Sequence, residues 1–168
     1  VTQHDGAIVE QHDPYAFPPL LTDFELHLFA EGTFYKAYDT VIRDFLYAVL
    51  TAMGMGGGFL HWVKLLLTNT GAVANVNGYI SQWCAYNAGV RQGCPLSPQL
   101  YLVVAQAMLS FLKAKGLGVP VWGRFFTASQ YADDAQVYLP SLQSLRPFLD
   151  AMAVFKRASG QGLNLDKT

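Results

Sequence analysis

The most constraining feature of the sequence is a pair of adjacent carboxylates between two short apolar runs. Asp133 and Asp134 lie within QYADDAQVYL, residues 130–139, which is typical of a strand, a tight turn and a second strand. Neighbouring side chains on a strand point to opposite faces, so only a turn lets both carboxylates approach one place. Two carboxylates held together repel each other unless a cation neutralises them, and such oxygen ligands suit Mg²⁺. The pair alone also fits a solvated turn, where Asp is favoured.

The composition is that of a folded domain with little charge. Apolar residues make up 52% of the 168 residues and charged residues 14%, where about a quarter is usual. This length suits one domain with a substantial core. The net charge of −1, with 11 Lys and Arg, argues against strong autonomous nucleic-acid binding, because phosphate neutralisation needs clustered cations. Both ends look cut from a longer protein, and we expect that protein to supply most of any surface that binds the nucleic-acid backbone.

Strands and helices alternate irregularly along the rest of the chain. Asp39 or Thr40 can cap a helix that follows them. The dipeptide Asn77-Gly78 is a strong hairpin signal, and Ser97-Pro98 is typical of a helix N-terminus after a Gly- and Pro-rich loop. This mixture predicts an α+β fold, with an antiparallel sheet and helices packed on one face. Cys84 and Cys94 are predicted to be free thiols.

Three segments, in this order, resemble the reverse transcriptase of non-LTR (LINE-type) retrotransposons. They are residues 34–46, 89–98 and 131–134, supported by residues 160–168. The run Arg-Gln-Gly-Cys-Pro-Leu-Ser-Pro is highly specific, and Tyr-Ala-Asp-Asp follows it at a suitable interval. The resemblance covers residues 34–168, whereas residues 1–33 form an irregular segment that does not match what the family has before its first motif. It implies a polymerase palm-like sheet with partial fingers and no thumb.

The resemblance also implies roles for individual residues. Asp133 and Asp134 would be the catalytic carboxylates at the tip of the palm hairpin and would hold two Mg²⁺ ions. Tyr38 would be the steric gate, whose ring stacks under the sugar and excludes a ribose 2′-hydroxyl; by itself it is equally well a core aromatic. Lys167 would protonate pyrophosphate, although a frayed surface lysine fits as well.

The loop residues Arg91, Gln92 and Gly93 would pack against the incoming nucleotide and the template. Gln can form hydrogen bonds there, and Gly permits close backbone approach. The reaction implied is RNA-templated DNA synthesis, with an RNA template, a DNA primer and dNTPs as partners. An intact element would add an endonuclease and a thumb, and the expected location is the nucleus or cytoplasm.

One position departs from the family pattern. The first motif normally opens with an aspartate that bridges both metals, and Thr33 occupies that place. A neutral hydroxyl removes one negative charge and one bridging ligand, which ordinarily costs several kcal/mol of transition-state stabilisation. Glu31 is about 6–7 Å away along the strand, and Asp23 is further off, so rescue by either is not expected. Activity is therefore expected to be impaired.

Two other interpretations stay open. The chain is compatible with a catalytically inactive fragment derived from a retroelement. It is also compatible with a module that uses the sheet to bind RNA or a protein, although the low positive charge argues against RNA.

Overall fold

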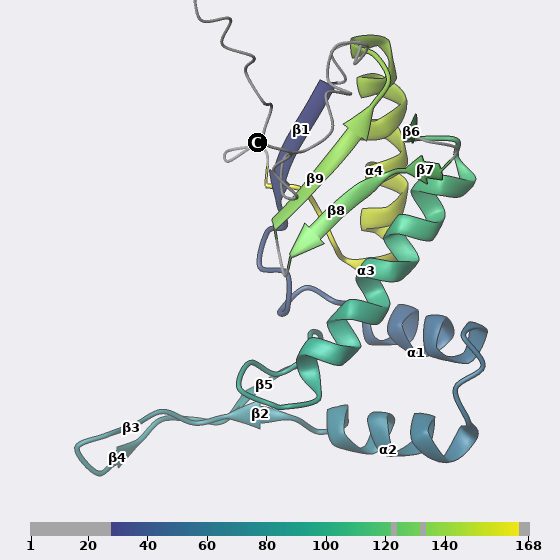
Figure 1. Ribbon diagram of the computed structural model, residues 1–168. Coiled ribbons are helices and arrows are strands. Elements are labelled where there is room, and N and C mark those ends of the chain that lie inside the picture. The colour runs from purple at the N-terminus through teal and green to yellow at the C-terminus, as the bar shows by residue number, and fades with distance from the viewer. Residues whose placement is uncertain (1–27, 122–123, 132–133, 165–168) are drawn as a thin grey trace, which may run out of the picture.

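The computed structural model describes residues 28–121, 124–131 and 134–164, and its largest sheet has three antiparallel strands in the order β1-β9-β8 (Figure 1). These strands are β1 (Leu28–Thr33), β8 (Ala128–Tyr131) and β9 (Asp134–Leu139). The expected hairpin around the acidic pair is therefore confirmed. Asp134 pairs with Tyr131 on one side and with Thr33 on the other, so the acidic turn and the end of β1 meet at one end of the sheet.

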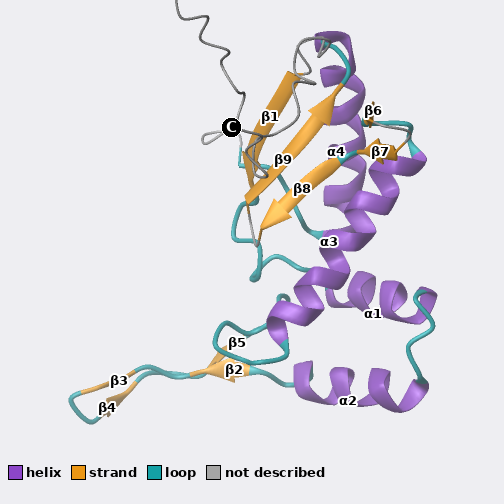
Figure 2. Cartoon of the chain, viewed as in Figure 1, coloured by secondary structure: helices purple, strands orange, loops and turns teal. Residues whose placement is uncertain are grey.

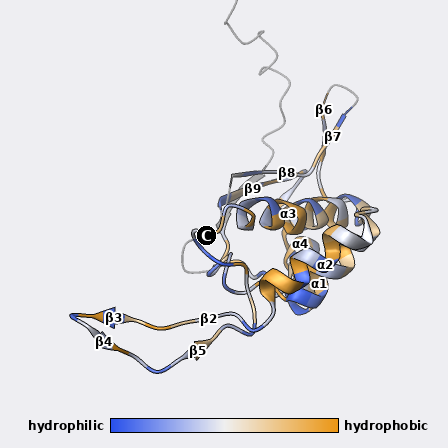
Figure 3. Cartoon of the chain, turned by 90° about the horizontal axis from the view of Figure 1, so that it is seen from below, coloured by the Kyte–Doolittle hydropathy of each residue, from blue (hydrophilic) through white to orange (hydrophobic). Residues whose placement is uncertain are grey.

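Two long helices, α3 (Ser97–Ala114) and α4 (Leu145–Ser159), lie on the same side of this sheet (Figures 1 and 3). A 3₁₀ turn, Leu142–Ser144, precedes α4. Along β9, Ala135, Val137 and Leu139 are buried and join the core, while Asp134 lies in the alternate, exposed register. Every second residue of β9 is therefore buried, and these residues pack against the apolar faces of the helices. The helices contribute Leu100, Tyr101, Val104, Met108, Leu112, Phe148, Met152 and Phe155 to this core.

Helix α1 (Arg43–Ala52) packs on α3 and α4, and α2 (Gly57–Leu67) packs on α1. Ile42 is the N-cap of α1 and makes no side-chain capping bond. The expected cap at Asp39 or Thr40 is wrong, because the Thr40 hydroxyl donates to the Lys36 carbonyl oxygen within the preceding turn.

Helix α3 also begins differently from the expectation. Ser97 is its first helical residue and not its cap, and Leu96 precedes it without a side-chain capping bond. The buried Ser97 N–H donates instead to the Cys94 carbonyl oxygen at 3.0 Å, so the loop before α3 is closed by its own backbone.

Four two-residue strands build a two-stranded arm that extends away from the helices (Figures 1 and 3). They are β2 (Gly71–Ala72), β3 (Asn75–Val76), β4 (Tyr79–Ile80) and β5 (Cys84–Ala85). Strand β3 pairs with β4, and β2 pairs with β5. Asn77 and Gly78 have φ of 51° and 84°, as a two-residue hairpin turn of type I′ requires. The expected hairpin is confirmed.

A further small hairpin, β6 (Val119–Val121) with β7 (Arg124–Phe126), follows α3. The chain therefore mixes helices with small antiparallel sheets (Figure 2), as expected of an α+β fold. Among the helices of the described residues, none has the length and apolar character needed to cross a membrane.

Candidate functional site

The end of the sheet brings Thr33 and Asp134 together. Thr33 Oγ1 donates a hydrogen bond to Asp134 Oδ1 at 3.2 Å, and the Asp134 side chain is exposed. Asp133 and Lys167, which the sequence also nominates, lie outside the described residues. Within the described ranges, no group of three or more His, Cys, Asp or Glu is placed to hold a metal ion. The described part of this end thus offers one carboxylate and one neutral hydroxyl.

The backbone at position 33 is fixed from its other side by the segment after α4. The Asn164 N–H donates to the Thr33 carbonyl oxygen at 2.7 Å, and the Tyr35 N–H donates to the Gly162 carbonyl oxygen at 2.9 Å. Phe34 and Leu163 form an antiparallel bridge between these bonds. Residue 33 is therefore held on both sides, with its side chain directed at Asp134.

Tyr38 lies in a tight turn that directly follows β1. Lys36 adopts a left-handed φ of 46°, and the Thr40 N–H donates to its carbonyl oxygen at 3.1 Å. The half-buried Tyr38 ring stacks on Tyr101 of α3, with centroids 4.9 Å apart and planes 17° apart. The Tyr101 hydroxyl accepts a hydrogen bond from Gln130 Nε2 of β8 at 3.4 Å. Tyr101, which the sequence does not nominate, thus links the Tyr38 turn to the acidic hairpin.

Gly160 and Gln161 lock this turn from the C-terminal side. Gln161 is 2% exposed, and its Nε2 donates to the Ala37 carbonyl oxygen at 2.8 Å and to Thr40 Oγ1 at 3.0 Å. Gly160 has φ of 82°, and a Cβ there would overlap the Thr40 carbonyl oxygen. These contacts hold the turn that carries Tyr38 against the end of α4.

The loop after the arm joins the same turn through its backbone. The Val90 N–H donates to the Tyr38 carbonyl oxygen, and the Gly89 N–H donates to the Val41 carbonyl oxygen, both at 2.8 Å. A Cβ at Gly89 would lie 2.7–2.8 Å from the carbonyl oxygens of Asp39 and Tyr38. Gly89, which the sequence does not nominate, is therefore the glycine that permits close approach.

Gly93 has a different reason to be glycine. A Cβ there would meet no described atom within 4 Å, and the residue has φ of 79°. The structure thus supports a conformational requirement at Gly93, because L-residues rarely adopt that φ. The close approach of a nucleotide to Gly93 stays a prediction, and Gly89 is the glycine of this loop at which the backbone meets another protein segment closely.

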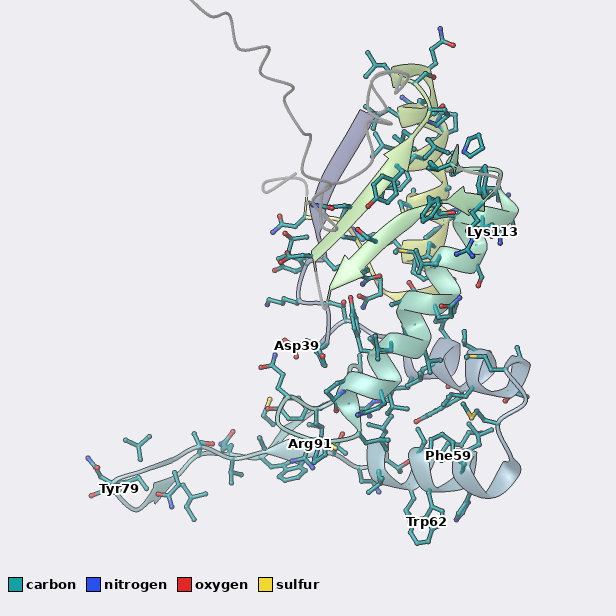
Figure 4. All side chains as sticks on the ribbon, viewed as in Figure 1. Asp39, Phe59, Trp62, Tyr79, Arg91 and Lys113 are labelled. Atoms are coloured by element: carbon teal, nitrogen blue, oxygen red, sulfur yellow. The ribbon has the colours of Figure 1, made fainter. Side chains whose placement is uncertain are left out.

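Arg91 and Gln92 line a pocket of about 510 Å³ beside the Tyr38 turn. Gln92 Nε2 donates to Asp39 Oδ1 at 3.3 Å, across 53 residues of sequence. The pocket also contains Lys36 and Arg43, so three cations and one carboxylate line it in a chain whose net charge is −1. An anionic ligand is favoured there. Figure 4 shows Asp39 and Arg91 on the side of the molecule from which the arm extends.

Arg43 ties the base of this loop to the helices. Its guanidinium donates to the carbonyl oxygens of Gly89 (3.0 Å), Ala88 (3.2 Å) and Leu67 (2.5 Å), and to Thr70 Oγ1 (3.0 Å). The planar fork of Arg suits several acceptors at fixed angles. Arg43 therefore positions both the start of the arm and the start of the loop that carries Arg91 and Gln92.

Comparison with known proteins places the chain in a family. The family model described as "Reverse transcriptase (RNA-dependent DNA polymerase)" matches residues 25–168. The 149 kDa protein of transposon TX1 of Xenopus laevis is 30% identical over 135 residues, which is 79% of this chain and 10% of that protein. The Pol polyprotein of the type-2 retrotransposable element R2DM of Drosophila melanogaster is 31% identical over 132 residues, 79% of this chain and 12% of that protein.

A shorter match has a different name. A 1,4-alpha-glucan branching enzyme of Nitrobacter hamburgensis is 42% identical over 72 residues, which is 42% of this chain and 9% of that protein. Because it covers less than half of the chain, the assignment rests on the family model and the two transposon proteins, of which this chain spans about a tenth. The chain belongs to the reverse transcriptase (RNA-dependent DNA polymerase) family, as a domain of the kind that non-LTR retrotransposons carry.

Proposed function

We propose that this chain is the nucleotide-handling part of an RNA-templated DNA polymerase whose metal site is impaired by Thr33. The observation that carries the proposal is the junction between two motif segments far apart in sequence. Gln92 Nε2 donates to Asp39 Oδ1, and the Val90 N–H donates to the Tyr38 carbonyl oxygen. This junction forms part of one pocket, which Lys36, Arg43 and Arg91 also line. The pocket lies beside Tyr38, the residue whose ring would contact a sugar.

The residues that line the pocket or adjoin it have distinct proposed roles. The Tyr38 ring lies next to this lining in the chain, beside Asp39, and is stacked on Tyr101 at 4.9 Å; it would discriminate against a ribose 2′-hydroxyl. The exposed Arg91 guanidinium can pair with phosphate through two parallel N–H donors. Gln92 is oriented by Asp39 and would contact the base or the template. The template is proposed to be RNA, and the substrates a DNA primer and dNTPs.

The described ligands do not fit a pair of divalent cations. Asp134 supplies one carboxylate, while Thr33 supplies a neutral hydroxyl that donates into that carboxylate. Glu31 is no substitute by register, because it pairs with Gln136 and Thr33 pairs with Asp134, two ladder positions further along. Two steps along a strand amount to about 6–7 Å. Asp133 remains the second candidate ligand for Mg²⁺, as the sequence proposes.

Restoring the missing carboxylate tests this proposal. The variant Thr33→Asp should extend a DNA primer on an RNA template when Mg²⁺ is present, and the unchanged chain should extend it far less. Adding Asp134→Ala or Asp133→Ala to Thr33→Asp should abolish the gain, because each removes a carboxylate from the proposed site. Circular dichroism would first establish that each variant is folded.

The hydrogen bond from Thr33 to Asp134 supports the second candidate, a catalytically inactive fragment. A carboxylate whose neighbour is a satisfied hydroxyl donor needs no cation for its stability. That function predicts no extension by Thr33→Asp, even when the chain is joined to the flanking regions of a full-length relative. Extension by the variant in that setting would exclude it.

A further inference from the structure

The arm combines exposure, apolar character and an absence of charge. From Asn69 to Val90 the sequence contains no Asp, Glu, Lys, Arg or His. Val76, Tyr79, Ile80 and Trp83 are 64%, 83%, 69% and 61% exposed, and Figure 3 shows hydrophobic stretches along the arm. Isolated exposed apolar residues are ordinary on proteins. A projecting ribbon of them indicates an interaction surface.

The two faces of the arm are defined by the pairing of its strands. Ala72 pairs with Cys84, and Asn75 pairs with Ile80, so residues 73 and 74 lie opposite residues 81–83 and the returning strand carries one extra residue. Residues 73 and 74 join β2 to β3 without an extra residue on this side, so counting by alternation places Ala72 and Val76 on one face. Tyr79 pairs with Val76 and shares that face.

The first of these faces, defined by Ala72, Val76 and Tyr79 and called here the template face, continues into the pocket that holds Arg91 and Gln92. Ala72 lines that pocket. On the opposite face, Trp83 and Ala85 line a second pocket of about 660 Å³ with Tyr47 and Asn69; it adjoins the first pocket, and Arg43, Tyr86 and Ala88 line both. The Trp83 ring lies across Gly71, where a Cβ would overlap it. Of these arm residues, Ala72 of the template face lines the proposed nucleotide pocket, whereas Trp83 and Ala85 line its neighbour.

We propose that the template face binds the single-stranded part of the template by stacking, with Tyr79 as its outermost platform; this rests on the proposed function. Flat rings bind bases of any sequence, because every base has a π-face. The arm carries no carboxylate to repel phosphates, and Lys36, Arg43 and Arg91 at its base supply positive charge. A strand on this face would pass from Tyr79 toward the pocket, and phosphate contacts would be confined to the base of the arm.

Binding of a fluorescent single-stranded RNA of mixed sequence by the full 168-residue chain tests the proposal. Tyr79→Ala should raise the dissociation constant about tenfold, as loss of one stacked base does, whereas Tyr79→Phe should bind like the unchanged chain. Tyr79→Leu keeps apolar bulk without a flat ring and should bind like Tyr79→Ala. The matched control is Ile80→Ala, at the neighbouring position on the opposite face.

The salt dependence and the oligomeric state complete the test. Tyr79→Ala should leave the slope of log affinity against log salt unchanged, because it removes no phosphate contact. Equal losses for Tyr79→Ala and Ile80→Ala would overturn the proposal, as would RNA binding by Tyr79→Leu equal to that of the unchanged chain. RNA binding that ignores Tyr79, together with light scattering that shows a dimer broken by Tyr79→Ala, would assign the face to a second copy of this chain.

This binding measurement is independent of catalysis. If Thr33→Asp extends primers but Tyr79 has no effect on RNA binding, the arm proposal fails and the proposed function stands. If Tyr79→Ala weakens RNA binding but no variant extends a primer, the proposed function fails and the arm remains a strand-binding surface.

Discussion

Thr33 Oγ1 donates a hydrogen bond to Asp134 Oδ1 at 3.2 Å, directly across the β1–β9 ladder. The two residues are 101 positions apart in the sequence. Their backbones are held in register by the ladder on one side and by the Asn164–Thr33 hydrogen bond on the other. A carboxylate at position 33 would therefore lie beside Asp134 without any backbone rearrangement. The proposed loss of the metal site therefore rests on the side chain at position 33 and not on the backbone that carries it.

The first prediction concerns stability with and without a metal. In EDTA, Thr33→Asp should lower the free energy of unfolding by about 1 kcal/mol, because the variant exchanges a hydrogen bond for repulsion between two exposed carboxylates. Saturating Mg²⁺ should raise the stability of the variant by about 1 kcal/mol or more, since a cation binds the folded pair. Urea unfolding in the two buffers measures both changes.

The control for this prediction is Thr33→Asn, which has the shape of the Asp variant without its charge. Mg²⁺ should leave its stability and that of the unchanged chain within about 0.5 kcal/mol. An equal effect of Mg²⁺ on all three proteins would place the cation elsewhere in the molecule.

A second prediction separates two glycines that share a left-handed backbone. Gly93→Ala should lower the free energy of unfolding by about 1 kcal/mol, the penalty of a positive φ alone. Gly160→Ala should lower it by about 3 kcal/mol, because the added Cβ also overlaps the Thr40 carbonyl oxygen and must displace packed backbone. Chemical denaturation measures both changes. Equal losses of unfolding free energy would mean that the backbone at the end of α4 shifts to make room for the added Cβ.

Sequence reasoning predicted the parts of the fold that rest on local signals. The β8–β9 hairpin follows from two apolar runs around an acidic turn, and the tip of the arm follows from Asn77-Gly78. A turn of type I′ needs two consecutive residues that tolerate positive φ, and Asn77 and Gly78, which are adjacent in the sequence, meet that requirement. The α+β class followed from the mixture of such elements.

Long-range contacts could not be predicted from the sequence. The cap of α1 was misplaced because the Thr40 hydroxyl bonds within its own turn and accepts from Gln161, 121 residues away. Tyr101 reads as one more apolar helix position, and only the fold reveals that its ring backs Tyr38. Gly89 lay inside the motif, but a close approach to the Tyr38 carbonyl oxygen is a property of tertiary structure.

A third prediction tests Arg43 as the tie at the base of the arm. Arg43→Lys keeps the charge but loses the planar fork that reaches four acceptors, and should lower the free energy of unfolding by about 2–3 kcal/mol. Arg146→Lys is the matched control, because Arg146 makes an exposed ion pair with Asp150 whose loss changes stability by at most about 0.5 kcal/mol. Similar small losses for both variants would show that water replaces the Arg43 contacts.

The last prediction concerns the thiol in the loop before α3. The Leu96 N–H has the largest effect on the Cys94 thiol and lowers its pKa; burial opposes this, and the Ser97 hydroxyl and N–H and the Arg91 charge lower the pKa further. A lowered pKa means that the reactive thiolate is populated at lower pH than in an ordinary cysteine. Cys94 should therefore be alkylated at lower pH than the exposed Cys84.

Two single-cysteine variants make this measurable. Cys84→Ser retains the thiol of Cys94, and Cys94→Ser retains that of Cys84. The pH midpoint of the iodoacetamide reaction rate should be lower for Cys84→Ser, because its thiolate is the one that the loop N–H groups stabilise. In concentrated urea the two midpoints should coincide, since unfolding removes those donors. Coincident midpoints in the folded proteins would show that the loop around Cys94 opens in solution.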